Sequence, residues 1–268
     1  MTDLRDKIKW HPGFCAAAGL ELKESIEYLE IIQEYGLSKE PLRIDLLIVK
    51  KTDKDNKLVD IKNEIGHIMR KYNIIEYKSP EDCMTIDDFC KTLAYALLYK
   101  GLSKRVNQIQ LEELTVSLFC QRYPKKMFKM LKAQGYCIKE IYSGIYYITG
   151  NIPIPMQVVV ISRLSPEKHS SLRVLSNKAK KDDIKRFIHE IQQLTKSGEK
   201  NDADAVLQVS GSANYDIYEE VWREENMCEV LERLMKDEID KKCNEARYEG
   251  KREGKREGKR LREIEAVK

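Results

Sequence analysis

The chain has 268 residues, of which 42% are hydrophobic and 34% charged, so it can bury a core while keeping a heavily charged surface. No apolar run approaches the roughly 18–20 residues of a membrane span, and the first residues lack the apolar stretch of a signal peptide. We therefore expect a cytoplasmic protein without membrane contact. The net charge of +4 arises in residues 241–268, where eleven Lys or Arg stand against six Glu, while residues 1–240 carry −1. A balanced body argues against a broad basic surface but permits a local groove.

Seven cysteines are scattered along the chain without a C-x-x-C pair. Their odd number and irregular spacing favour small buried thiols in a reducing compartment over a disulfide framework. The four histidines are equally dispersed, so the spacing of a zinc site is not recognisable.

The N-terminal part of the sequence predicts helices and strands in the order α, β, β, β, α, β. Hydrophobic patterning indicates a helix over residues 11–25, extended segments over 28–37, 42–51 and 73–78, a second helix over 86–101, and a strand over 114–120. Thr85 and Asp88 form a T-x-x-D capping signature before the second helix. Residues 58–71 are ambiguous, with a short helix as one interpretation.

The remainder predicts a hairpin over 136–150 with its turn at Ser143 and Gly144, and a strand from 156. Helical patterns follow at 180–196 and from about 213 to 242, separated by a polar stretch at 195–204. We expect a domain over 1–165, with its core at 11–122 and extra strands to 162, then a helical region over 166–245. A charged low-complexity tail at 246–268 repeats Gly every four residues, typical of a marginal helix or a disordered extension.

Asp45 interrupts an otherwise apolar strand, IDLLIV at residues 44–49. Burying an ionised carboxylate without a partner costs several kcal/mol, so we expect this side chain to face a cation, a cavity or a hydrogen-bond network. The alternative is an acidic residue at a strand end, solvated or paired with Arg43.

Glu76 and Lys78 lie two residues apart in the strand 73–78, and side chains two apart in a strand share a face. An ion pair on a solvated face would explain this spacing, and E-x-K alone is a weak motif. With Asp45 the pattern is more specific, because two early strands each break an apolar run with a carboxylate. If these strands are neighbours, Asp45 and Glu76 converge on one divalent cation, for which carboxylate oxygens predict Mg²⁺, with Mn²⁺ as a substitute.

The backbone carbonyl of Tyr77 lies between the two side chains and is a further candidate metal ligand. Lys78 would then lie beside an attacking water and a phosphate, where a point charge positions both. An interpretation as mere surface ion pairs predicts instead that Asp45 lies more than about 8–10 Å from Glu76, or on the opposite sheet face, too far to share one ion.

These features resemble the PD-(D/E)XK nuclease superfamily, most of all its bacterial branch of nuclease-family transposases or recombination-promoting nucleases. The resemblance covers residues 11–122 and includes the segments EPLRIDLLIVKK, NEIG and NIIEYKSPED. It implies an α/β fold with a restriction-endonuclease-like αβββαβ core, in which a mixed central sheet is flanked by helices, plus a helical C-terminal region. Ile44 stands where the family name expects Pro before the first Asp.

The resemblance further implies a Mg²⁺-dependent endonuclease that hydrolyses DNA phosphodiester bonds in mobile-element or recombination activity. Asp45, Glu76 and Lys78 would be catalytic. A carboxylate on the first helix often helps to hold metal in this family, and Glu21 is selected here, with two glutamates that follow it as rivals. Cutting both strands of a duplex is compatible with a homodimer that binds DNA.

Lys91, Tyr95 and Tyr99 lie four apart on one face of the predicted helix 86–101. They either contact phosphates and support Lys78, or fill the edge of the core. A catalytically silent nucleic-acid-binding or interaction protein on the same scaffold is the alternative to an enzyme.

Overall fold

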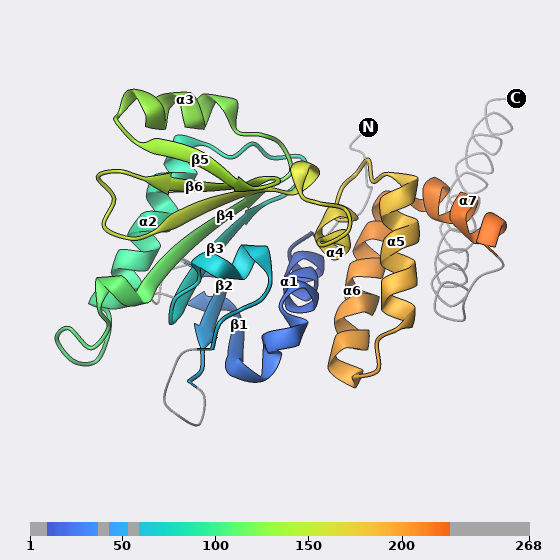
Figure 1. Ribbon diagram of the computed structural model, residues 1–268, viewed down its shortest axis with the longest axis horizontal. Helices are drawn as coiled ribbons and strands as arrows, with labels where there is room; N and C mark the ends of the chain where they lie inside the picture. The colour runs from blue at the N-terminus through green and yellow to red at the C-terminus, as the bar shows by residue number, and fades with distance from the viewer. Residues whose placement is uncertain (1–9, 37–42, 53–58, 226–268) are drawn as a thin grey trace, which may run out of the picture. The chain divides into compact units, whose positions relative to one another are not determined.

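The computed structural model describes residues 10–36, 43–52 and 59–225, arranged as Figure 1 shows. By compactness the chain forms two units, Met1–Tyr215 and Asp216–Lys268. The predicted boundary at residue 165 falls inside the first unit, and the predicted tail at 246–268 lies outside the described residues. Within the described residues, no helix has the length and apolar character needed to cross a membrane.

The first unit contains one seven-stranded sheet. Its strands are β1 (Leu29–Gly36), β2 (Arg43–Lys50), β3 (Tyr72–Lys78), β4 (Leu114–Cys120), β5 (Cys137–Tyr142), β6 (Ile145–Thr149) and β7 (Met156–Val160). The α-helices are α1 (Trp10–Glu21), α2 (Ile86–Gly101), α3 (Lys125–Ala133), α4 (Ser170–Arg173), α5 (Lys181–Gln192), α6 (Ser197–Ala213) and α7 (Tyr215–Glu225). Short 3-10 helices are η1 (Lys23–Tyr28), η2 (Glu64–Ile68), η3 (Leu111–Glu113) and η4 (Ile161–Arg163).

The sheet has the order β1-β2-β3-β4-β7-β6-β5 and is mixed. The central strands β3, β4 and β7 run parallel to one another. The pairs β1-β2, β2-β3, β7-β6 and β6-β5 are antiparallel. Every residue of β4 and β7 is buried, as expected for central parallel strands covered on both faces. The protein is therefore an α/β structure with a mixed sheet flanked by helices and a helical C-terminal part.

Helices cover both faces of the sheet (Figure 1). On one face α1 lies against β3 and β4, because the Phe14 ring stacks on Tyr77 with centroids 4.3 Å apart and meets Phe119 edge-on at 5.1 Å. On the other face α2 begins at the predicted cap, where the side chain of Thr85 accepts from the Asp88 N–H and Asp88 accepts from the Thr85 N–H. This reciprocal cap fixes where α2 starts relative to the end of β3.

Of the C-terminal helices of the first unit, α4 and α6 pack on α1, and α5 packs on α4. α6 approaches α1 so closely that a Cβ atom added to Gly13 would lie 2.8 Å from Cβ of Val209. α4 is tied to α5 by a buried ion pair in which the guanidinium of Arg173 donates two hydrogen bonds of 2.8 Å to Asp183. α1 is consequently clamped between the sheet and α6.

Three details of the sequence prediction are wrong. α6 begins at Ser197, inside the polar stretch predicted to separate two helices, and α1 ends at Glu21 instead of residue 25. Of the described cysteines, only Cys15 and Cys120 are buried, while Cys83, Cys90 and Cys137 are exposed thiols.

The predicted hairpin turn is confirmed at Gly144, whose φ of +76° favours glycine.

The close contact between α1 and α6 makes Gly13 sensitive to substitution. A Gly13→Ala change gains about 1 kcal/mol in helix propensity but forces the two helices apart, and we expect a net loss of about 1–2 kcal/mol in the free energy of unfolding. Gly198→Ala in α6 is the matched control, because an added Cβ there meets nothing within 4 Å. Urea denaturation in which both variants are equally stable would contradict the predicted packing.

Candidate functional site

The start of β2 lies beside the end of β3, and the predicted acidic residues lie there. In their antiparallel ladder Leu46 lies opposite Ile75, and the next step of the same register brings Asp45 beside Glu76. There the Tyr77 N–H donates a hydrogen bond of 2.9 Å to Oδ2 of Asp45. The Asp45 carboxylate thus lies against the peptide that joins Glu76 to Tyr77. This position differs from the wide separation that surface ion pairs would predict.

The carboxylate of Asp45 does not pair with the neighbouring arginine, which was the simplest alternative. Arg43 is exposed and lies 3.4 Å from Glu34. The basic side chain near Asp45 is His11 at the start of α1, with its Nε2 atom 3.7 Å from Oδ2 of Asp45. This contact with Asp45, opposed by partial burial, raises the pKa of His11.

Glu76 is the most deeply buried of the predicted charged site residues, with 3% of its surface exposed. Its Oε1 atom lies 2.6 Å from Nζ of Lys91 and 3.6 Å from Nζ of Lys78. Burial, reinforced by the negative charge of Asp45, raises the pKa of Glu76 although both lysines oppose the shift. The site therefore concentrates negative charge in a poorly hydrated place and compensates it with ammonium groups.

Lys78 is held by the first turn of α2. Its Nζ atom lies 2.8 Å from Oδ1 of Asp88, while Oδ2 of the same carboxylate accepts hydrogen bonds from the backbone and hydroxyl of Thr85. Burial alone would raise the pKa of Asp88, but the hydrogen bonds from Lys78 and Thr85 outweigh it and lower that pKa. Likewise, burial would lower the pKa of Lys78, yet Asp88 and Glu76 raise it. One carboxylate thus caps the helix and orients the lysine.

The basic and aromatic face predicted on α2 divides between two roles. Lys91 reaches Glu76 directly and lies 5.7 Å from the centre of the Tyr95 ring. Tyr95 is buried, and Tyr99 meets Tyr72 with ring centroids 5.5 Å apart. The two tyrosines fill the edge of the core, whereas Lys91 belongs to the site.

Asp45, Glu76 and the Tyr77 carbonyl offer oxygen donors of the kind that Mg²⁺ prefers. Two adjacent carboxylates, one of them buried, form a like-charge pair that a divalent cation would neutralise. Within residues 10–36, 43–52 and 59–225, no three His, Cys, Asp or Glu side chains already stand as a ligand set. The donor set therefore fits a metal on the condition that Glu76 exchanges its lysine partners for the ion.

The structure does not bring Glu21 to these residues. Glu21 ends α1, and ten residues of helix separate it from His11 by about 15 Å along the axis. Its carboxylate contacts Nδ1 of His169 at 2.5 Å, accepts from Asn63 at 3.2 Å, and accepts from the Ser171 hydroxyl. Glu21 is therefore a structural anchor at the opposite end of the helix from Asp45.

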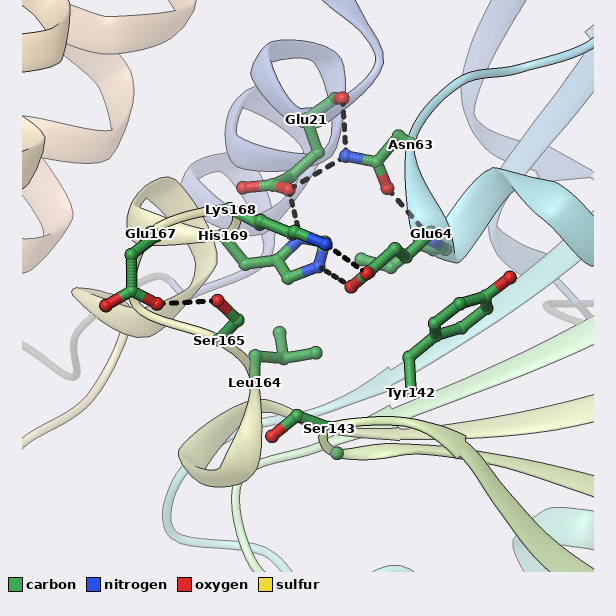
Figure 2. Close-up of polar contacts among 12 residues, drawn as sticks. Glu21, Asn63, Glu64, Tyr142, Ser143, Leu164, Ser165, Glu167, Lys168 and His169 are labelled. Atoms are coloured by element: carbon green, nitrogen blue, oxygen red, sulfur yellow. Dashed lines mark hydrogen bonds and ion pairs between the residues drawn. The ribbon is translucent and has the colours of Figure 1, made fainter.

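Figure 2 shows the polar cluster around His169, which joins α1, η2 and the segment before α4. The fully buried imidazole bridges two carboxylates, because its Nε2 atom also lies 3.4 Å from Glu64. Lys168 pairs with Glu64 from the solvent side. Burial would lower the pKa of His169, but Glu21 and Glu64 outweigh it and raise that pKa. A cavity of about 380 Å³ adjoins the cluster, lined by groups of both charges.

Sequence reasoning missed His11 and the second task of Asp88. The i, i+3 spacing of His11 and Phe14 puts both on one helix face, so the burial of Phe14 could have indicated that His11 faces the sheet.

Comparison with models of protein families, with curated proteins and with solved structures gives no match for this chain. Functional inference therefore rests on the geometry of the residues themselves.

The His169 cluster predicts a pH-dependent stability. The folded pKa of His169 is raised above its unfolded value near 6.5, so its stabilisation is complete below about pH 6.5 and is lost as the pH rises through the folded pKa. We expect His169→Gln to lower the free energy of unfolding by about 3 kcal/mol at pH 6 and by less at pH 9, because Glu21 loses its positive partner while Glu64 keeps Lys168. Urea denaturation at both pH values tests this. A cost that does not change with pH would contradict a charged His169.

Proposed function

We propose that this chain is a Mg²⁺-dependent DNA endonuclease of the PD-(D/E)XK type, with Asp45, Glu76 and Lys78 as its catalytic residues. The observation that supports the proposal most is the hydrogen bond from the Tyr77 N–H to the Asp45 carboxylate, which holds that carboxylate next to Glu76. Lys78 follows two residues after Glu76 on β3. The element order α1-β1-β2-β3-α2-β4 agrees with a restriction-endonuclease-like core.

In this proposal the residues of the site divide three tasks. Asp45, Glu76 and the Tyr77 carbonyl would hold a divalent cation, whose chemistry when bound would be to lower the pKa of a water and neutralise charge on the phosphodiester. Lys78 places an ammonium group beside that water and the phosphate, and Asp88 keeps the ammonium in one position. Lys91 neutralises the charge of the Glu76 carboxylate and would have to give way to a bound cation.

Several wider features belong to the same proposal. We propose a role in mobile-element or recombination activity, and a homodimeric state, from the resemblance to the PD-(D/E)XK nucleases. A cytoplasmic location is supported by the free thiols of the described cysteines, which suit a reducing compartment.

Plasmid cleavage tests the proposal. We expect purified protein to nick or linearise supercoiled DNA with Mg²⁺ or Mn²⁺ and to lose this activity in excess chelator. Glu76→Gln and Lys78→Met should each lower the rate by about 100-fold or more, because each removes charge from the reacting centre. Lys71→Met is the matched control, since Lys71 precedes the same strand but pairs with Glu113, and it should cleave within about twofold of wild type.

The outcomes separate the enzyme from its alternatives. Cleavage that persists in both site variants would assign the activity to a contaminant or to another site. Wild-type protein that is folded and binds DNA but cleaves none with either metal would favour the catalytically silent binding protein.

A further inference from the structure

The start of α1 delivers a histidine to the predicted metal ligands. His11 lies one helical turn before Phe14, whose ring is fixed between Tyr77 and Phe119. The imidazole also meets the Tyr77 ring edge-on, with centroids 5.5 Å apart. Packing of α1 on the sheet therefore holds the half-exposed His11 side chain beside the start of β2.

The position of the imidazole suits coordination as well as ion pairing. The Nε2 atom lies 3.7 Å from Oδ2 of Asp45, and two neighbouring ligands bound about 2.1 Å from one ion lie roughly 3.0–3.5 Å apart. A small side-chain rotation closes that difference. The His11 side chain is 52% exposed, so an ion can reach the nitrogen from solvent, whereas Glu76 approaches from the buried side.

We propose that His11 is a ligand of the divalent cation held by Asp45 and Glu76, in the place that the sequence had assigned to Glu21. This inference rests on the proposed metal site. The ligand set is then one imidazole nitrogen with carboxylate and carbonyl oxygens. The residues of this set come from three separate elements, α1, β2 and β3.

A nitrogen ligand changes which ion the site prefers. Carboxylate, carbonyl and water oxygens suit Mg²⁺, Ca²⁺ and Mn²⁺, whereas imidazole suits transition metals. The protein should therefore bind Mn²⁺ more tightly than Mg²⁺, and His11 should be the cause of that preference. A simple ion pair between His11 and Asp45 predicts no such selectivity.

Metal binding by the full chain, without substrate, tests the assignment. Calorimetric titration with Mn²⁺ alone and Mg²⁺ alone should show that His11→Ala weakens Mn²⁺ binding by about 10–100-fold but changes Mg²⁺ binding by less than about threefold. Glu76→Gln should weaken both ions. His189→Ala is the matched control, because His189 is an exposed histidine of α5 and should leave both affinities unchanged.

Pulsed electron paramagnetic resonance of Mn²⁺ bound to the wild type gives a second readout that does not depend on a variant's folding. A directly bound imidazole produces a ¹⁴N modulation, which should vanish in His11→Ala and remain in His189→Ala. Mn²⁺ binding that requires Glu76 but shows no ¹⁴N signal and no effect of His11→Ala would overturn this inference and leave the proposed metal site intact. Absence of Mn²⁺ binding, or binding unaffected by Glu76→Gln, would overturn both.

Discussion

The buried carboxylate of Glu76 sets the conditions for everything around it. An ionised carboxylate with 3% exposure is unstable without counter-charge, and the chain supplies Lys91 from α2 and Lys78 from its own strand. Holding Lys78 in turn requires Asp88, which also caps α2. The start of α2, the two lysines and the end of β3 therefore form one electrostatic unit. Glu76 and Asp88 balance the two lysines, and Asp45 adds a third carboxylate beside them.

α1 connects this unit to the rest of the protein. Its N-terminal turn carries His11 to Asp45, and its last residue, Glu21, is locked by His169. Between these ends Phe14 stacks on the sheet and Gly13 admits α6. The C-terminal helices of the first unit thus determine the position of α1, and through it the position of the histidine proposed as a metal ligand.

Sequence patterning predicted what depends on local periodicity. The strands, the cap at Thr85 and the grouping of Asp45, Glu76 and Lys78 follow from apolar runs and from the alternation of side chains. Choosing between His11 and Glu21 required knowing which end of α1 meets β2, and that is decided by long-range packing. α6 escaped prediction because its buried face includes the small residues Ala203, Ser210 and Gly211, so its sequence lacks the strong apolar stripe of a typical surface helix.

A crystal structure of the protein soaked with Mn²⁺, with anomalous scattering recorded at the manganese edge, tests the central claim most directly. The account predicts one strong anomalous peak about 2.0–2.4 Å from oxygens of Asp45, Glu76 and the Tyr77 carbonyl, with Lys91 displaced from Glu76. A fully occupied Mn²⁺ elsewhere, or a Glu76 that keeps both lysines at saturating metal, would contradict it.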